Sequence, residues 1–372
     1  MRVDRPLRLL AGLTPEQFMR RHWQKEPLVV RGAVPSIRPL SRAQLFALAA
    51  DDDVESRLIV RRGRNGWTLK HGPFARSALP PLKRPNWTLL VQGVDLHDDA
   101  AYALVQSFRF VPDARLDDLM ISWASDGGGV GPHFDSYDVF LLQAHGRRRW
   151  RIGRTRDASL DPNAPLKILR RFVPEQELVL DAGDMLYLPP QWAHDGVAVG
   201  PNCMTYSIGM RAPQRGELAA ELVARLADSL DDTTLYRDPR QPAARRPAAI
   251  PAELQTFATA AVRSLIAETG ATERVLGELL SEPKPHVWFE RALKPWRPGA
   301  VDLDRRTRML YDAHHVYINS ESVSVGGKDA ALLRRLADER GLDARAVRGA
   351  SRTARALLRE WFNAGWLQRR NG

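Results

Sequence analysis

Three features are scarce in this chain of 372 residues, and each scarcity excludes a class of protein. Cys203 is the single cysteine, so the chain has no internal disulfide, which fits a reducing cytoplasm. Apolar runs are short, and none approaches the roughly 18 consecutive residues that a transmembrane helix needs. The first segment, Met1 to Leu13, is too interrupted for a signal peptide. We therefore expect a cytoplasmic protein with no membrane partner.

Lysine is the third scarce feature, because it supplies only 7 of the 55 basic residues and arginine supplies the others. The formal net charge of +11 favours residence near nucleic acid or an RNA-rich assembly. A solvated, arginine-rich surface is the alternative interpretation. The apolar fraction of 44% indicates a globular protein, and the length predicts two or three domains.

The pattern His133-Phe134-Asp135, followed later by His194, is the strongest chemical signal in the sequence. Two imidazoles and one carboxylate are the ligand set of a non-haem Fe(II) oxygenase. In a strand, residues i and i+2 point to the same face, so His133 and Asp135 can reach one metal ion. His194 must then arrive from a later strand. Three ligands on one face of an octahedron leave positions for a cosubstrate and dioxygen.

A second copy of the pattern, His97-Asp98-Asp99, is a decoy. It lies in an acidic turn before an apolar segment that reads as the start of a helix. His133 instead follows the glycine-rich segment 126–132, and such a backbone allows a small ligand to approach closely. We therefore assign the metal to His133 and not to His97.

From about residue 27 to 210 the chain reads mainly as short strands separated by glycine and proline turns. This pattern favours a β-sandwich or jelly roll. The expected strands include residues 28–30, 58–60, 87–91, 120–123, 138–142, 150–152, 178–180, 185–187 and 204–208.

After Pro213 the pattern becomes helical. Helices are expected at 217–230, 254–267 and 272–280, and the first carries a stripe of leucines at a spacing of four, Leu218, Leu222, Leu226 and Leu230. We expect these helices to pack against another subunit and form a homodimer. The alternative is that they dock on the strand-rich domain of their own chain.

A third unit begins near Lys284. Short strands near 309–318 and 323–325 and helices at 328–339 and 353–362 suggest a winged-helix topology. Residues 328–372 contain 11 basic and 5 acidic residues, which is compatible with a nucleic-acid-binding face. Arginines on the outer face of an amphipathic helix are, alternatively, simply solvated.

The run Gly146-Arg147-Arg148-Arg149-Trp150 is the second chemical signal. An oxygenase that consumes 2-oxoglutarate must bind the carboxylate remote from the metal, and arginine offers a charged bidentate fork for it. Alternation places Arg148 on one face of a strand and its two arginine neighbours on the other. The alternative interpretation is a basic hairpin turn.

Four segments in combination resemble the JmjC-type bacterial ribosomal oxygenases. They are residues 131–140 with Gln143, 146–150, 183–190 and 192–194. The likeness covers nearly the whole chain and is nearest to members that hydroxylate an arginine of large-subunit ribosomal protein sixteen. It implies a mainly β oxygenase domain of the cupin-like JmjC class (double-stranded β-helix, or jelly roll) at 1–211. A helical dimerisation region at 212–282 and a winged-helix domain at 283–372 would follow.

The resemblance also implies ligand-binding roles. His133, Asp135 and His194 would bind Fe(II), and Arg148 would bind the carboxylate of 2-oxoglutarate. Cosubstrates would be 2-oxoglutarate and O2, converted to succinate and carbon dioxide as an unactivated C–H bond gains a hydroxyl. The expected partners are a large-subunit ribosomal protein as substrate, a second copy of the chain, and ribosomal RNA in a weak contact.

One position departs from the family. The supporting serine falls at Ala124, and Ser122, on the same face of an extended strand, could replace it. Near the opening, Tyr137, Asp138 and Asp126 are the candidates for binding a substrate arginine, although Asp138 is alternatively a structural residue.

Two other functions stay open at this point. The same chemistry could act on a ribosomal histidine or an RNA nucleoside. The chain could instead be a non-catalytic winged-helix protein that binds nucleic acid.

Overall fold

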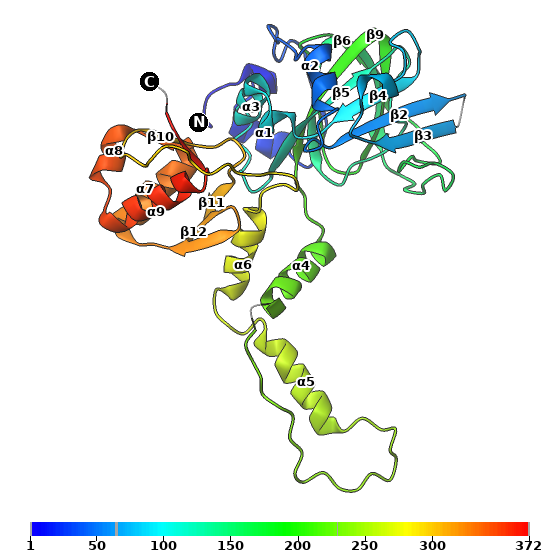
Figure 1. Ribbon diagram of the computed structural model, residues 1–372. Helices are drawn as coiled ribbons and strands as arrows, with labels where there is room; N and C mark the ends of the chain where they lie inside the picture. The colour runs from blue at the N-terminus through cyan, green and yellow to red at the C-terminus, as the bar shows by residue number, and fades with distance from the viewer. Residues whose placement is uncertain (1, 64–65, 229, 371–372) are drawn as a thin grey trace. The chain divides into compact units, whose positions relative to one another are not determined.

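The computed structural model describes residues 2–63, 66–228 and 230–370. The chain folds into two compact units, Met1–Ala212 and Pro213–Gly372, and Figure 1 shows the elements of each. Among the described residues, none of the helices has the length and apolar character to cross a membrane.

The first unit is built on an antiparallel sheet, and its mainly β character confirms the predicted fold class. The strands are β1 (Leu28–Val30), β2 (Ser56–Arg62), β3 (Gly66–His71), β4 (Trp87–Val91), β5 (Leu116–Ala124), β6 (Asp138–Arg154), β7 (Gln176–Leu180), β8 (Met185–Leu188) and β9 (Trp192–Met210). Their order in the sheet is β1-β8-β6-β9-β5-β4-β2-β3, and β7 pairs with β6 beside this path. The two long strands, β6 and β9, pair from Asp138 opposite Met210 to Arg154 opposite Trp192.

Three helices of this unit begin at side-chain caps. Thr14 and Ser41 form complete capping boxes at α1 (Pro15–Arg21) and α2 (Arg42–Leu48), which satisfy otherwise unpaired helix N–H groups. The Asp98 carboxylate accepts from the backbone N–H of Ala101 at the start of α3 (Asp99–Gln106). The acidic turn at His97 is therefore a helix start, as predicted.

The core of this unit lies between the sheet and these helices and is rich in aromatic side chains. Trp87 and Trp123 are buried on neighbouring strands with their ring centroids 4.6 Å apart. Phe18 of α1 packs edge-on against Tyr187 of β8 at 4.9 Å. This packing holds the helices on the sheet. The glycine-rich segment 126–132 follows β5 and leads into the loop that carries His133.

Two parts of the sheet differ from the sequence prediction. Segments 138–142 and 150–152 belong to one strand, β6, because bulges near His145 absorb Gly146 without a turn. The interpretation of residues 146–150 as a basic hairpin turn is therefore wrong. The strand β3 was not predicted, since its sequence alternates weakly and it pairs only with β2 at the sheet edge.

The second unit begins with three helices, α4 (Arg215–Asp228), α5 (Ala252–Ser264) and α6 (Ala271–Leu280). Leu226 of α4 is buried against Ala271 and Val275 of α6, and Leu222 packs on the same cluster. The leucine stripe of α4 is thus partly covered within the chain. The predicted helix reached Leu230, but Ser229 lies outside the described residues.

The rest of the second unit is a small α/β body. Its elements are β10 (Val301–Leu303), β11 (Met309–Tyr311), β12 (His315–Ile318), β13 (Glu321–Ser324), α7 (Gly327–Glu339), β14 (Gly341–Leu342), α8 (Ala344–Gly349), α9 (Arg352–Asn363) and β15 (Leu367–Arg369). Two three-stranded sheets have the orders β14-β10-β15 and β11-β12-β13. A helix-turn-helix is formed by α8 and α9, and their apolar faces join α7 in one core around Leu333, Leu358 and Trp361.

Candidate metal centre

The predicted metal ligands come from β9 and from the loop between β5 and β6. His133 and His194 form an antiparallel bridge, with N–H to O=C hydrogen bonds of 3.0 and 2.8 Å between them. The backbone carbonyl of Asp135 accepts from Gln191 N–H at 2.8 Å. The His133–Asp135 segment is therefore not a full strand, as the motif suggested, but a loop that is extended and held against β9.

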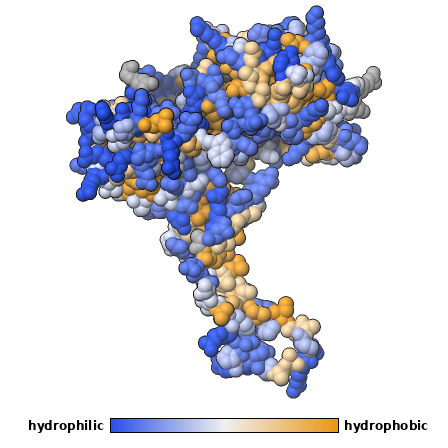
Figure 2. Space-filling model, viewed as in Figure 1, coloured by the Kyte–Doolittle hydropathy of each residue, from blue (hydrophilic) through white to orange (hydrophobic). Residues whose placement is uncertain are grey.

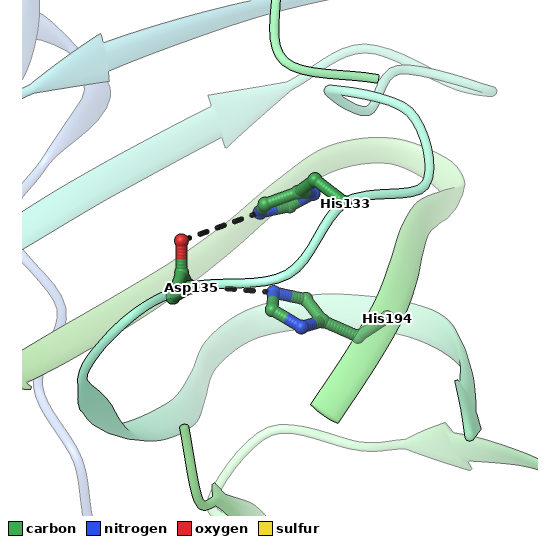
Figure 3. Close-up of side chains that lie close together, drawn as sticks. All are labelled: His133, Asp135 and His194. Carbon is green, nitrogen blue, oxygen red and sulfur yellow. Dashed lines mark ion pairs between the residues drawn. The ribbon is translucent and has the colours of Figure 1, made fainter. Parts of the chain in front are cut away.

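The three side chains point toward one another (Figure 3). Nε2 of His133 lies 4.0 Å from Oδ1 of Asp135, and Nε2 of His194 lies 3.6 Å from Oδ2 of the same carboxylate. The ligand atoms of all three lie within 4.8 Å of one another. Within the part of the chain that the structure describes, no other group of three or more histidine, cysteine or acidic side chains has this arrangement.

Both imidazoles are oriented by backbone carbonyls. Nδ1 of His133 donates to Gly131 O, and Nδ1 of His194 donates to Trp192 O, each at 2.9 Å. Because a carbonyl only accepts, the proton sits on Nδ1 and the Nε2 lone pair faces Asp135. Gly131 has a φ of 81°, a left-handed conformation that favours glycine.

The donor set fits a divalent transition metal such as Fe(II). Burial, followed by the charge of a protonated His133, lowers the pKa of His194 to about 4, so that its imidazole is neutral at pH 7. Two imidazoles and one carboxylate on converging backbones are the facial triad of a non-haem iron site.

The triad lines a cavity of about 490 Å³ that also contains Arg148. Arg148 is only 3% exposed, its Nη2 donates to Ser122 Oγ at 3.3 Å, and its guanidinium lies 5.7 Å from the Trp150 ring. Its Nε is buried without a hydrogen-bond partner, and no carboxylate of the described residues forms an ion pair with it. A buried, unpaired guanidinium is costly, so the cavity is built to receive an anion.

The structure also shows where Ser122 and Ala124 lie, at the place where the sequence departs from the family's serine. Ser122 lines the cavity and touches Arg148, whereas Ala124 is buried in a small cluster with Ala198 and Cys203. The predicted alternation is confirmed for Arg148 and Arg147, because Arg148 lines the cavity and Arg147 is exposed on the opposite face of β6.

The three candidate substrate residues lie in different places. Tyr137 lines the cavity near the metal centre and is 40% exposed. Asp138 faces the core instead, where its carboxylate accepts from Tyr187 at 2.6 Å, Gln24 at 3.0 Å and Arg115 at 3.3 Å. Burial raises the pKa of Asp138, and the first two hydrogen bonds oppose the rise. Asp138 is therefore placed as a structural residue.

Asp126 lies outside the lining of the cavity. Its carboxylate accepts from the backbone N–H of Gly200 at 2.8 Å, and its carbonyl accepts from Asn86 N–H at 2.8 Å. These contacts fasten the start of the glycine-rich loop to its neighbours, so the structure gives Asp126 a structural role.

Sequence reasoning missed two acidic residues of the cavity, Asp117 and Asp118. Neighbouring residues of a regular strand face opposite sides, but β5 is irregular between Leu116 and Leu119. This bulge brings both side chains to the cavity. The adjacent acids just before the predicted strand 120–123 were the available signal, because two neighbouring acids are unfavourable in a regular buried strand.

Comparisons with known proteins agree with this geometry. The JmjC domain family model matches residues 103–218, and the ROXA-like winged helix model matches residues 264–368. The chain is 36% identical over 289 residues to the ribosomal protein uL16 3-hydroxylase of Escherichia coli strain K12, covering 76% of each chain. It is also 36% identical over 234 residues to a probable ribosomal oxygenase of Haemophilus influenzae, covering 61% of this chain and 55% of that protein.

Solved structures show the same relationship. The X-ray structure of E. coli ycfD superposes with a TM-score of 0.84 at 31% identity, covering 96% of this chain and 98% of that one. A structure of the ribosomal oxygenase YcfD in complex with cobalt and 2-oxoglutarate has a TM-score of 0.80, with the same identity and coverage. The chain thus belongs to the JmjC ribosomal oxygenases, a family of enzymes that depend on iron(II) and 2-oxoglutarate.

Proposed function

We propose that this enzyme hydroxylates an arginine side chain of a large-subunit ribosomal protein. His133, Asp135 and His194 hold Fe(II), and Arg148 holds the remote carboxylate of 2-oxoglutarate. The observation that carries the proposal is the burial of Arg148, without an acidic partner, in the same cavity as the triad. A dianion that binds a metal at one end and a guanidinium at the other satisfies both groups.

Bound iron would activate dioxygen. The reaction converts 2-oxoglutarate to succinate and carbon dioxide, and it inserts one oxygen atom into a substrate C–H bond. Groups of the chain itself orient the metal ligands and the arginine that binds the cosubstrate. Carbonyls of Gly131 and Trp192 orient the two imidazoles, and Ser122 steadies the Arg148 guanidinium. Apolar side chains of Val139 and Leu141 line the cavity and restrict access of water.

A cationic substrate is supported by the acids of the cavity. Asp117 and Asp118 line it together with Tyr137. Burial raises the pKa of the Tyr137 phenol, and the charges of Asp135, Asp118 and Asp117 raise it further while the charge of Arg57 lowers it, so acids outnumber cations around the ring. A guanidinium can stack on the face of a tyrosine ring and donate hydrogen bonds to carboxylates at the same time. A neutral imidazole carries no charge for the acids of the cavity to attract. These groups favour arginine over histidine.

Mass spectrometry of ribosomal proteins from a deletion strain tests the substrate. We expect one arginine of one large-subunit protein to lose the mass of a single oxygen atom, and the purified enzyme to restore it with Fe(II) and 2-oxoglutarate. Loss of oxygen from a histidine or from an RNA nucleoside would contradict the arginine assignment and leave the iron chemistry in place.

We also propose that the enzyme is a homodimer through α5. No residue of this helix is buried, and Leu254, Val262 and the following Ile266 are 37%, 65% and 61% exposed. Apolar side chains are visible along this segment in Figure 2. An exposed apolar helix face is typical of a protein interface, and two copies meeting across a two-fold axis would cover it.

The proposed ribosomal substrate supports a cytoplasmic enzyme that works close to ribosomal RNA. The net charge of +11 favours a weak contact with that polyanion, because guanidinium groups displace the counterions that surround it.

A further inference from the structure

The helix-turn-helix of the second unit carries an arginine-rich surface that the oxygenase reaction does not use. Helices α8 and α9 and the link between them, residues 344–363, contain one acidic residue, Glu360, and five exposed arginines. These arginines, Arg345, Arg348, Arg352, Arg355 and Arg359, are named here the α8–α9 arginine face. None of the five forms an ion pair with a described acidic residue.

Two acids close to these arginines, Asp343 and Asp329, are already engaged elsewhere. Asp343 caps α8 by accepting from Ala346 N–H at 2.8 Å, and it pairs with Arg335 of α7 at 2.9 Å. Asp329 accepts from the hydroxyl of Ser351 at 2.6 Å. The α8–α9 arginine face is therefore left with its charge uncompensated, in contrast to Arg335, which has two acidic partners.

The arginines of α9 also oppose the helix dipole. The first turn of α9 has no acidic residue and contains Arg352 and Arg355, although the N-terminal end of a helix favours negative charge. Arg359 follows at a spacing of four, so the three guanidinium groups share one side of the helix. Ala354, Leu358 and Trp361 face the core on the other side. Cations placed there cost stability and point to an anionic partner outside the chain.

The position of α9 identifies the kind of partner. In a helix-turn-helix, the second helix faces nucleic acid and the first contacts its backbone. Here α9 is the second helix, and Arg345 and Arg348 lie on the first, α8 (Figure 1). A guanidinium can donate two parallel hydrogen bonds to two oxygens of one phosphate. Five arginines across two helices therefore fit successive phosphates of a double helix.

We propose that the α8–α9 arginine face binds the phosphate backbone of double-helical RNA. The choice of RNA over DNA rests on the proposed ribosomal substrate. The deep major groove of an A-form duplex is too narrow for a helix to read its bases, so the contact is with phosphates and is independent of sequence. This surface anchors the enzyme to the RNA that surrounds its substrate protein.

Fluorescence anisotropy of the full chain with a labelled RNA duplex tests the proposal, with a DNA duplex and polyglutamate as the other arms. We expect RNA affinity to fall about a hundredfold between roughly 50 and 200 mM salt, as a contact with about four phosphates requires. The triple variant R352E/R355E/R359E should lose most of the binding, and R352Q/R355Q/R359Q should reduce the slope of log affinity against log salt by about 3.

A matched control separates this surface from general basicity. The loop between α4 and α5 contains Arg237, Arg240 and Arg245, which are equally exposed. The variant R237E/R240E/R245E changes the charge by the same amount and should keep RNA affinity within about twofold. Equal loss in both triple variants, tighter binding of polyglutamate than of RNA, or no RNA binding at low salt would overturn the proposal. Equal affinity for the DNA duplex would overturn RNA as the partner.

Stability and activity measurements complete the test. If the arginines serve binding and not folding, R352E/R355E/R359E should have a higher melting temperature than the parent, since acids at the start of α9 suit the helix dipole. A lower melting temperature would indicate a structural role and contradict the proposal. Hydroxylation of an isolated substrate peptide should be unchanged in this variant, so failure of RNA binding is distinguishable from failure of the proposed arginine hydroxylation.

Discussion

Arg148 of β6 donates a hydrogen bond of 3.3 Å to the hydroxyl of Ser122 on β5, inside the cavity that the metal triad lines. The hydrogen bond fixes the buried guanidinium of Arg148 to a hydroxyl on another strand of the same sheet. It leaves the guanidinium Nε without a partner and therefore defines where an anionic cosubstrate would bind.

Loss of the guanidinium should weaken binding of 2-oxoglutarate specifically. We expect Arg148→Ala to raise the KM for 2-oxoglutarate about ten- to a hundredfold, because a charged hydrogen bond in a closed pocket contributes about 1.5–3 kcal/mol. Arg147→Ala on the exposed face of the same strand is the matched control and should change this KM little. Equal effects of the two substitutions in steady-state succinate assays would contradict the role of Arg148.

The anchoring serine should matter less than the arginine it holds. Ser122→Ala removes one neutral partner of Arg148, so a rise of a few-fold in the KM for 2-oxoglutarate is expected, corresponding to about 1 kcal/mol. Ala124→Ser restores the family's serine in a tightly packed cluster and should not rescue the S122A variant. Full rescue would show that the contact belongs at position 124.

Turnover should depend on every ligand of the triad. We expect His133→Ala, Asp135→Ala and His194→Ala each to abolish succinate formation while the circular dichroism spectrum stays native, because the three side chains bind metal and do not build the core. His97→Ala, in the decoy motif, should retain most of the activity. Loss of activity in H97A with activity retained in H133A would reverse the assignment.

Two neighbouring residues should separate substrate binding from folding. Tyr137→Ala is expected to raise the KM for the ribosomal peptide with little effect on 2-oxoglutarate, since the ring lines the cavity near the metal centre. Asp138→Ala should instead lower the free energy of unfolding by about 1–3 kcal/mol, because it leaves the buried hydroxyl of Tyr187 without its acceptor. Denaturant titration beside peptide kinetics distinguishes these outcomes, and an unaffected stability in D138A would contradict the structural role.

The oligomeric state should respond to charge on α5. We expect light scattering at micromolar concentration to give twice the chain mass of 41.8 kDa, and Val262→Arg to reduce it to the monomer by placing a charge in an apolar contact. Thr256→Arg on the opposite side of the helix is the control and should stay dimeric. A parent protein that elutes as a monomer would rule out the homodimer.

Local signals in the sequence were sufficient for several elements. Two helix starts have purely local signals, Thr14-Pro15 with Gln17 and Ser41 with Gln44, because a capping box satisfies N–H groups within one turn and needs no distant partner. The alternation around Arg148 predicted that it lies on the opposite face from Arg147 and Arg149, since the pleat of a strand has a period of two. The triad was also predictable, because its residue types are those the metal requires.

Other features depended on contacts between segments far apart in the chain. Residues 138–154 form one strand only because β9 pairs along its whole length and bulges absorb Gly146. Asp138 turns to the core because Tyr187, Gln24 and Arg115 meet it there. The helix α8 was not predicted, since a helix this short is stable only when its buried face packs on neighbours.

The sequence by itself thus determined the candidate ligand types, the alternation of the three arginines and the local helix starts, all of which arise from residue type and periodicity. Only the tertiary structure decided that Asp117 and Asp118 both reach the cavity, because a bulge in β5 overrides the alternation of a regular strand. It likewise decided that the loop bearing His133 is held beside His194 by two backbone hydrogen bonds. Such pairings form between distant segments, whose register depends on the packing of the whole sheet.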